Sequence, residues 1–361
     1  MSEHLTPRIV DDGMTTLSHL LLAPGTDGAI AAIPPGLSLD ALEELRALAD
    51  SNHVIVRGLE AILALKAGDE MCADWAAAAL AAERQRINNA VPFLHAICGA
   101  LAEAGHDATV IKSLDHWPDL GSDLDLYTNG NPREICALMQ TRFQAQIAPR
   151  SWGDRLARKW NFLLPGLPEA VEIHMGRLGQ TGEQVSIASW LTSRAQWLQV
   201  GDFSFKVPSD SDRLLISALQ RMYRHFYFRL CDIVDTATLS DLKGIEYADL
   251  RSSAAAAGIW EGAATYMVVV SDYLERYRGY GLGLPGFVSA SARFGGEAVY
   301  YGRGFLRVPI IPQSARLYGS QLTGLLRKRE LHNGARLSLL PWLATAAVVG
   351  QKITGSDKGI W

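Results

Sequence analysis

Four short apolar segments between residues 108 and 176 constrain the fold more than any other feature of the sequence. They read ATVIK, SDLDLYT, RKWNFLL and EAVEIHMG, and Gly, Pro or Asp residues bound each of them. Short runs with such boundaries are typical of β-strands. The turn residues PGLPEA between the third and fourth segments indicate that these two strands pair as a hairpin. The sequence therefore predicts a small sheet near the centre of the chain.

Helical sequence precedes, interrupts and follows this sheet. Residues 40–105 are rich in Ala, Leu and Glu at helical spacing. The segment NPREICALMQTRFQAQ has Pro132 near its first turn and apolar residues at helical spacing, which predicts a helix that crosses over the sheet. After KVPSDSD the chain turns helical again through LLISALQRMYRHFYFRLCDIVDTATL. We therefore expect an α+β fold: a small mixed β-sheet core with helices on one side, flanked by N-terminal and C-terminal helical regions.

Two segments of the C-terminal region need separate interpretations. Residues 279–304 contain eight glycines, which excludes a plain helix and indicates a loop over a surface or cleft. The segment LSLLPWLATAAVVG, residues 337–350, is the most apolar one, but it is shorter than the roughly 20 residues that a membrane span needs, and it holds a Pro. We expect a buried helix there, with an interfacial helix as the alternative, and no membrane span.

Composition limits the partners and the compartment. The formal net charge is −4, which lacks the basic excess of proteins that bind extended nucleic acid. The N-terminal residues MSEHLTPRIVDD do not resemble a signal peptide, so cytoplasmic residence is expected. The four cysteines form no CxxC pair and have no matching His spacing, so we expect buried, reduced thiols and no zinc site; they are Cys72, Cys98, Cys136 and Cys231.

Asp123 and Asp125 are the strongest candidates for chemistry. In SDLDLY, strand geometry sends Leu124 and Leu126 to one face and both carboxylates to the other, with the two Asp Cα atoms roughly 7 Å apart. Two carboxylates on one face repel each other, and the natural cation between them is Mg²⁺, with Mn²⁺ as a substitute. Because Mg²⁺ completes its coordination with waters and phosphates, the pair suggests nucleoside triphosphate chemistry. Alone it is a weak signal, since such pairs are commonly solvated turn or edge residues.

The residues before this pair strengthen the hypothesis. Ser113 lies ten residues before Asp123, and the turn-rich LDHWPDLG lies between them. Such a turn can present backbone N–H groups and a hydroxyl to a triphosphate. Lys112 would supply a point charge beside the phosphates. Ser122, which adjoins the acidic pair, belongs to the same predicted nucleotide-binding set.

A third carboxylate is expected from the fourth strand. In AVEIHMG, Val171 and Ile173 point to the core, while Glu172 and His174 share the other face. If this strand neighbours SDLDLY, three carboxylates converge; otherwise Glu172 is an exposed edge residue. His174 could donate to a phosphate or hold Glu172 in place, although a single His on a strand is also compatible with a structural role.

The segments IKS, GSDLDLY and VEIHM, in this order and spacing, resemble the uncharacterised nucleotidyltransferase family of the polymerase-β superfamily. That family shows a Lys-Gly turn, a DxD strand and a later acid-x-His strand. The likeness continues through LLISALQRMYRHFYFRLCDIVD, where the family has a helix that carries a His and ends near an Asp, so it covers about residues 90–240. The chain departs from the family pattern at Ser113, where Gly is usual, and at Glu172, where Asp is common.

The predicted helix after the sheet carries a mixed stripe. Arg221, His225, Phe228 and Asp232 fall at i, i+4, i+7 and i+11, and a stripe of charged and aromatic character suits contact with a nucleotide. The alternative is that Asp232 pairs with Arg229 or Arg221 while Phe228 packs inward.

The resemblance implies a Mg²⁺-dependent nucleotidyltransferase that moves a nucleoside monophosphate from a nucleoside triphosphate to a hydroxyl or similar group of a small-molecule, peptide or protein acceptor. Two alternatives remain. One is an inactive relative of toxin-antitoxin type that binds a nucleotide or a partner protein. The other is an RNA-terminal transferase, which would need a basic track for the RNA.

The predicted regions are a helical N-terminus at 1–95, the nucleotidyltransferase core at 96–207 and a mostly helical C-terminus at 208–361. The predicted catalytic and metal-binding residues are Asp123, Asp125 and Glu172, and the predicted nucleotide-binding residues are Lys112, Ser113, Ser122, His174, Arg221 and His225. His116 and Trp117 are expected to be exposed loop residues outside the chemistry.

Overall fold

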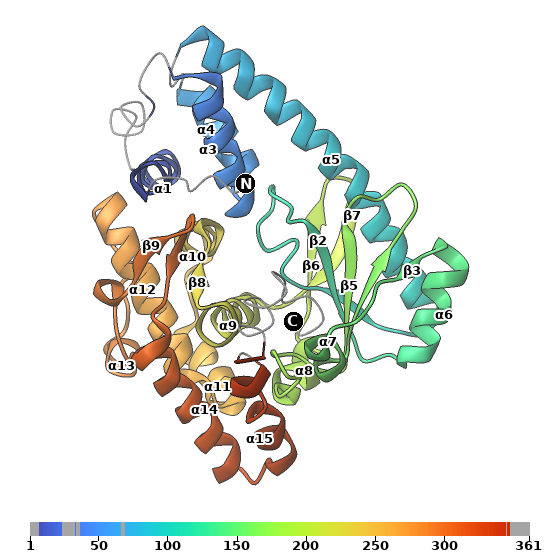
Figure 1. The fold of residues 1–361 in the computed structure, drawn as a ribbon. Coiled ribbons are helices and arrows are strands. Elements are labelled where there is room, and N and C mark those ends of the chain that lie inside the picture. The colour runs from blue at the N-terminus through green and yellow to red at the C-terminus, as the bar shows by residue number, and fades with distance from the viewer. Residues whose placement is uncertain (1–6, 24–32, 34–36, 66–68, 344, 347–361) are drawn as a thin grey trace.

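A computed structural model describes residues 7–23, 33, 37–65, 69–343 and 345–346. It confirms the α+β fold: a central sheet of mixed direction lies between helices that precede it and helices that follow it (Figure 1). The division into three regions at residues 95 and 207 stays a prediction. One hydrophobic core runs through the N-terminal helices, the sheet and the C-terminal helices.

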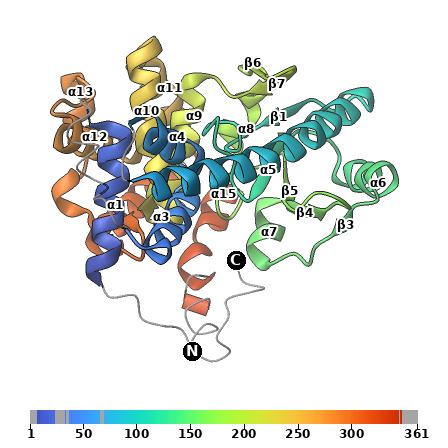
Figure 2. The same cartoon turned by 90° about the horizontal axis from the view of Figure 1, so that it is seen from above.

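The N-terminal helices are α1 (Pro7–Leu22), α3 (Leu39–Ser51), α4 (Ile55–Leu65) and α5 (Glu70–Glu103). The side chain of Asp69 begins α5 by accepting a hydrogen bond from the backbone N–H of Cys72 at 3.0 Å. Helix α5 is 34 residues long and runs along the molecule from the other N-terminal helices to the sheet, where it contacts β1 and β7 (Figure 2). It therefore links the N-terminal region to the core.

The central sheet contains the four predicted strands and one short addition. Its elements are β1 (Ala108–Val110), β2 (Asp123–Thr128), α6 (Pro132–Phe143), β3 (Gln146–Ile147), α7 (Trp152–Ala157), β4 (Lys159–Leu163) and β5 (Ala170–Met175). The strand order is β1-β2-β5-β4-β3. Strands β2 and β5 are parallel, whereas β4 and β5 form the predicted antiparallel hairpin. The predicted helix between the second and third strands is α6.

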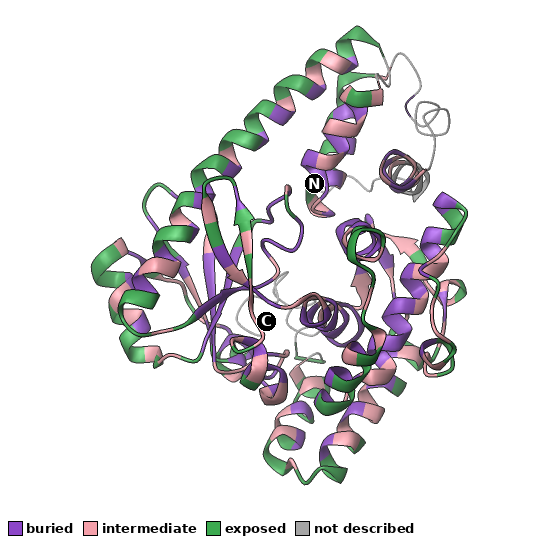
Figure 3. Ribbon diagram, turned by 180° about the vertical axis from the view of Figure 1, so that it is seen from behind, coloured by how far each residue is buried: buried purple, intermediate pink, exposed green. Residues whose placement is uncertain are grey.

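Alternation along β2 and β5 separates a core face from a polar face. Leu124, Leu126 and Ile173 are fully buried. Figure 3 shows many buried residues on the strands and exposed residues along the outer sides of α5 and α6. The intervening residues of the two strands carry the acidic side chains, so the sheet presents its polar groups toward the C-terminal helices.

A second hairpin follows the central sheet and was not predicted. Helix α8 (Val185–Leu191) leads into β6 (Gln196–Val200) and β7 (Phe203–Val207), which pair in antiparallel fashion. Strand β7 also contacts β1 and α5. The hairpin therefore closes the edge of the central sheet beside β1.

The expectation of one continuous helix after KVPSDSD is wrong. Helix α9 (Asp210–Gln220) changes into the π-helical turn η1 (Arg221–His225), and Phe226 then adopts a left-handed conformation with φ 55°. Strand β8 (Tyr227–Phe228) follows and pairs with β10 (Phe305–Arg307) before α10 (Leu230–Lys243) begins. The pairing of β8 with β10, almost eighty residues away in the chain, outweighs the local helical pattern. The aromatic residues of β8 also favour a strand.

The remaining C-terminal elements cover the far side of α9. They are α11 (Tyr247–Ala257), α12 (Trp260–Arg278), α13 (Gly286–Ser289), η2 (Gly296–Ala298), β9 (Tyr300–Gly302), η3 (Ile310–Ser314), α14 (Ala315–Arg327) and α15 (Leu331–Leu337). The glycine-rich segment 279–304 is not a plain helix, as expected. It contains a short helix and ends with β9, which pairs with β10.

The expectation of a buried helix at residues 337–350 is wrong for the part that the structure describes. Leu337 is buried, but Trp342 is 76% exposed. Helix α15 packs against α14, and residues 340–343 beyond it are helical but exposed or half-buried. Residues 344 and 347–350 lie outside the described residues. Among the helices that are described, none combines the length and the apolar character that crossing a membrane requires.

Candidate functional site

The register of the two parallel strands places Asp125 directly beside Glu172. Both side chains are largely buried, whereas Asp123 lies exposed at the start of β2, two residues earlier on the same face. The three predicted carboxylates therefore share one face of the sheet. Asp123 and Asp125 line one pocket together with Glu172.

Lys112 and His174 contact the two inner carboxylates. The amino group of Lys112 forms an ion pair with Asp125 and lies 3.3 Å from Oε1 of Glu172. Nε2 of His174 lies 2.7 Å from the same Glu172 oxygen and 3.7 Å from Oδ1 of Asp125. Lys112 reaches this position from a left-handed backbone conformation, φ 63°, two residues after the end of β1. The side chain of a single lysine thus bridges two carboxylates that would otherwise repel each other.

Lys159 is a further cation at this site that the sequence analysis missed. Its Nζ lies 2.8 Å from Oε2 of Glu172 and 2.9 Å from Oδ1 of Asp154. Lys159 is the first residue of β4 and pairs with His174 across the hairpin. Alternation along RKWNFLL could have placed this lysine on the acidic face. To place Lys159 beside Glu172, the register of the β4–β5 hairpin would also have been needed, and the turn sequence does not determine that register.

The two predicted serines occupy different positions. The Oγ of Ser113 accepts a hydrogen bond from the backbone N–H of Asp125 at 2.7 Å and donates to the carbonyl of Asp123 at 3.2 Å. Its hydroxyl therefore fixes the turn to β2. Ser122 is exposed, and both serines line the pocket.

Three arginines face the acidic strand across the pocket. Arg221 and Arg224 belong to η1, and Arg229 precedes α10. The pocket has a volume of about 670 Å³ including its open mouth. Arg224 and Arg229 were not among the predicted nucleotide-binding residues, and Arg229 was considered only as a partner of Asp232. A pocket with acids on one wall and arginines on the other suits a phosphate chain with a bound cation.

The predicted stripe on a single helix does not exist, since η1 and β8 interrupt it. Arg221 and His225 line the pocket, but Phe228 is fully buried and stacks on Tyr266 at 5.3 Å. Asp232 forms a buried ion pair with Arg221 at 2.7 Å. The alternative interpretation of Asp232 and Phe228 is therefore the one that the structure shows.

The expectation that His116 is an exposed loop residue is wrong. Its side chain is buried, lines the pocket and lies with Nδ1 2.5 Å from Oδ2 of Asp235 on α10. The turn between β1 and β2 folds back onto α10, a contact between residues 119 positions apart in the chain. Trp117 is 38% exposed, as expected. His53, which follows α3, also lines the pocket.

The surroundings shift the pKa values of Asp123 and Glu172 in opposite directions. Partial burial, followed by the charges of Asp125 and Glu172, raises the pKa of Asp123 to about 6. Burial also disfavours ionisation of Glu172, but Lys112, His174 and Lys159 outweigh it and hold the pKa of Glu172 well below its usual value. Glu172 is therefore ionised at neutral pH. Asp123 is protonated as the pH falls through about 6.

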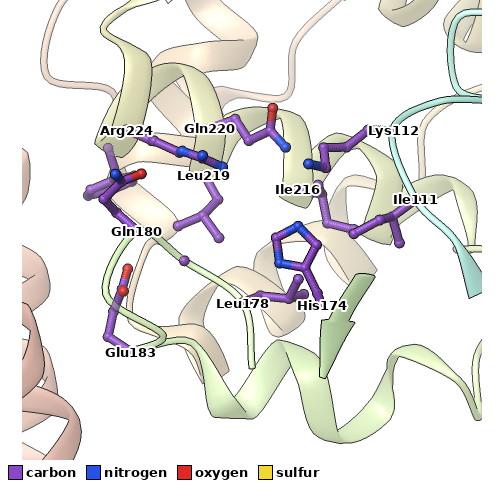
Figure 4. Close-up of a pocket in the computed structure, with 12 residues that line it drawn as sticks. Ile111, Lys112, His174, Leu178, Gln180, Glu183, Ile216, Leu219, Gln220 and Arg224 are labelled. Atoms are coloured by element: carbon purple, nitrogen blue, oxygen red, sulfur yellow. The ribbon is translucent and has the colours of Figure 1, made fainter. Parts of the chain in front are cut away.

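A second pocket adjoins the first and is more apolar. It has a volume of about 420 Å³ including open space, and Lys112, Gln220 and Arg224 line both pockets. Figure 4 shows His174, the amino group of Lys112 and the side chain of Gln220 on α9 around this second pocket. Its apolar lining consists mainly of Ile111, Leu178, Ile216, Leu219 and Tyr223. An apolar group could bind here beside a charged group in the first pocket.

The donor set of the acidic strand fits a hard divalent cation. Asp123, Asp125 and Glu172 offer carboxylate oxygens, which Mg²⁺ prefers. Ligand atoms of Asp125, Glu172 and His174 lie within 4.8 Å of one another, whereas Asp123 is outside this tight group. A cation shared by the aspartates would therefore lie nearer the mouth of the pocket, and Lys112 would have to leave Asp125.

Comparison of the chain with models of protein families gives no match, and comparison with curated proteins gives no significant match. Function is therefore inferred from the geometry of the two pockets and from the sequence pattern.

Proposed function

We propose that the chain is a Mg²⁺-dependent nucleotidyltransferase that transfers a nucleoside monophosphate from a nucleoside triphosphate to an acceptor hydroxyl or similar group. The observation that supports it best is the pairing of Asp125 with Glu172 on adjacent parallel strands, with Asp123 on the same face and arginines opposite. This arrangement agrees with the sequence resemblance to the polymerase-β superfamily.

Asp123 and Asp125 would hold Mg²⁺ against the triphosphate, and Glu172 would complete a second position near the acceptor. When bound, Mg²⁺ supplies charge neutralisation on the phosphates and lowers the pKa of the attacking hydroxyl. Lys112 exchanges its contact with Asp125 for a phosphate oxygen. Arg224 offsets charge on the β- and γ-phosphates from the opposite wall.

The chemical step follows from these positions. The acceptor oxygen forms a bond to the α-phosphorus, and the bond from that phosphorus to the β-bridging oxygen breaks. Pyrophosphate leaves with the electron pair, and the acceptor proton passes to solvent, because Lys112, His174 and Lys159 hold the pKa of Glu172 well below its usual value. The apolar second pocket beside Lys112 is suited to the acceptor or to the nucleobase. A small molecule, a peptide or a protein side chain would meet this requirement.

Transfer of a radiolabel from the α-phosphate to candidate acceptors tests the proposal. We expect transfer with Mg²⁺, and a loss of at least about 100-fold in Asp123→Ala and Asp125→Ala, because the metal site is lost. Asp202→Ala, at an exposed aspartate in the β6–β7 turn, is the matched control and keeps full activity. Label transfer that survives both site substitutions contradicts the assignment.

One observation favours a second candidate, a nucleotide-binding protein without turnover. Lys112 and Lys159 already neutralise Asp125 and Glu172, so the acidic pair needs no metal for its electrostatic balance. Calorimetry distinguishes the two functions. Nucleotide binding that is independent of Mg²⁺ and never yields pyrophosphate supports the second candidate.

A further inference from the structure

His53, His116 and Cys231 form a second cluster of donor atoms, which the nucleotidyl-transfer scheme does not use. One ligand atom from each residue lies within 4.8 Å of those from the other two. Sγ of Cys231 is 3.7 Å from Nε2 of His116, and the rings of His53 and His116 lie 5.4 Å apart in an edge-to-face arrangement. The three residues come from three parts of the chain, so no short sequence motif predicts the cluster.

Asp235 holds His116 in the orientation that this cluster needs. Its Oδ2 lies 2.5 Å from Nδ1 of His116, which leaves Nε2 directed toward Cys231. Oδ1 of Asp235 is in turn paired with Arg57 at 2.6 Å. A carboxylate that binds the far nitrogen of a histidine is the usual arrangement behind a metal-binding imidazole, because it fixes the ring and its tautomer.

The spacing of the donors fits a tetrahedral metal ion. Zinc bonds of about 2.3 Å to sulfur and about 2.0–2.1 Å to nitrogen place the two ligand atoms roughly 3.6 Å apart at a tetrahedral angle. The observed separation between Cys231 and His116 is 3.7 Å. Arg229 lies 3.4 Å from Nδ1 of His53, a long contact that a metal bond would replace. The positive charge of Arg229 opposes a cation here, and a metal would have to displace the proton of Cys231, because burial raises the pKa of this thiol.

A nucleophilic role for Cys231 fits the geometry less well. Cys231 contacts His116, which in turn contacts Asp235, as in a catalytic triad. However, Cys231 is completely buried and does not line the pocket. His53 and His116 do line it. A substrate in the pocket would therefore meet the imidazole side of the cluster and not the sulfur.

We propose that His53, His116 and Cys231 bind a thiophilic divalent cation of the Zn²⁺ class, with a fourth coordination position open to the pocket. Three protein ligands with one open position are typical of zinc sites that bind water or substrate. Asp235 acts as the positioning residue. The site lies in the same pocket as Asp123 and Asp125 but uses none of their carboxylates, so it does not depend on nucleotidyl transfer.

Metal binding to the full chain tests this proposal directly. We expect metal-stripped protein to take up about one Zn²⁺ per chain in competition with a chromophoric chelator. Cys231→Ser and His116→Gln should each lower the affinity by at least about 100-fold, and Asp235→Asn by about 10- to 100-fold. Cys136→Ser, at a half-buried cysteine on α6, is the matched control and should bind as the unsubstituted chain does. The double variant Asp123→Ala/Asp125→Ala should also retain Zn²⁺.

Cobalt substitution gives a second readout that needs no variant of a buried residue. Co²⁺ bound by Cys231 should show a thiolate-to-metal charge-transfer band and the absorption of a tetrahedral ion. Absence of the thiolate band in the Co²⁺-loaded chain, or Zn²⁺ affinity unchanged by Cys231→Ser, overturns the proposal. Loss of Zn²⁺ binding in the Asp123→Ala/Asp125→Ala variant would also overturn it, because the metal would then be held by the acidic strand.

Discussion

At the scale of single residues, several of the charges around the pocket already have partners within the protein. Lys112 and Lys159 neutralise the inner carboxylates, and Asp232 neutralises Arg221 on the opposite wall. Asp123 has no such ion pair among the described residues, and partial burial together with the charges of Asp125 and Glu172 raises its pKa. It is also exposed at the start of β2, so a cation that enters the pocket can reach it.

Magnesium should bind more weakly as the pH falls through about 6. Burial, with Asp125 and Glu172 nearby, raises the pKa of Asp123 to about 6, so this carboxyl is protonated below that pH and cannot ligate a metal. The pKa of Glu172 is well below its usual value, so Glu172 stays ionised throughout. Each pH unit below the pKa of Asp123 should lower the affinity by up to about tenfold. Calorimetric titration with Mg²⁺ at pH values on both sides of this pKa measures the effect.

Asp123→Asn is the control for this pH dependence. The variant should bind Mg²⁺ weakly and with little change through the same range, because the titrating carboxyl is gone. An affinity of the unsubstituted chain that stays constant through pH 6 would contradict the expectation.

The substitution Asp232→Asn should strongly destabilise the fold. Arg221 and Asp232 are both buried and lie 2.7 Å apart, so the change leaves an uncompensated guanidinium in the interior. Removal of one partner of a buried pair costs about 3–5 kcal/mol. The free energy of unfolding, measured in urea, should fall by that amount, whereas Asp202→Asn at the exposed control position should change it by less than about 0.5 kcal/mol. Equal stabilities of the two variants would show that the pair contributes nothing.

The acidic part of the site was predictable because local periodicity determines it. Alternation along SDLDLY and AVEIHM placed Asp123 and Asp125 on the polar face of one strand and Glu172 on the polar face of the other. That the two strands are neighbours was a condition of the prediction, which the parallel pairing of β2 with β5 meets. Lys159 and His116 were missed for another reason. Their positions depend on a hairpin register and on a contact between the β1–β2 turn and α10, and neither leaves a local signal in the sequence.

At the scale of elements, the junction between α9 and α10 decides where the arginine wall lies. A continuous helix would have placed Arg221 and Asp232 three turns apart along one axis. Instead, η1 and the left-handed Phe226 reverse the chain into β8, which brings Asp232 back to Arg221. The sequence pattern was helical throughout this segment, so the break follows from tertiary pairing with β10.

Gly262→Ala should displace this junction. A Cβ at Gly262 on α12 would lie 2.3 Å from the ring of Tyr223 in η1, and both residues are buried. Overpacking of this kind costs about 1–3 kcal/mol, and we expect nucleotide binding to weaken as well because Arg224 follows Tyr223 directly. Urea unfolding and calorimetry measure the two effects.

Gly99→Ala on α5 is the matched control for that substitution. Gly99 is also a helical glycine, but no atom lies within 4 Å of its added Cβ. This variant should gain up to about 1 kcal/mol from helix propensity and bind nucleotide normally. If Gly262→Ala is as stable as Gly99→Ala, then η1 moves to accommodate the added methyl group without a loss of stability.

At the scale of the whole molecule, three distant parts of the chain form the walls of one pocket. His53 comes from the N-terminal helices, the carboxylates come from the sheet, and Arg221, Arg224 and Arg229 come from the junction before α10. Arg57 on α4 adds a structural link, since it pairs with Asp119 after β1 and with Asp235 on α10. A ligand in the pocket would therefore contact regions that otherwise meet mainly through the core.

A nucleoside triphosphate with Mg²⁺ should consequently raise the temperature of thermal unfolding. A ligand present at a hundred times its dissociation constant stabilises a protein by about 2.7 kcal/mol, which corresponds to a rise of several degrees. The rise should require Mg²⁺, should disappear in Asp125→Ala and should be smaller in Arg224→Ala, which changes the opposite wall and leaves the acidic strand intact. A nucleoside monophosphate should give a smaller rise because it lacks the phosphates that the arginines would contact. Two results would show that the ligand does not bridge the sheet and the arginine wall. One is an equal rise in unfolding temperature with the triphosphate and the monophosphate. The other is an equal rise in Asp125→Ala and in the unsubstituted chain.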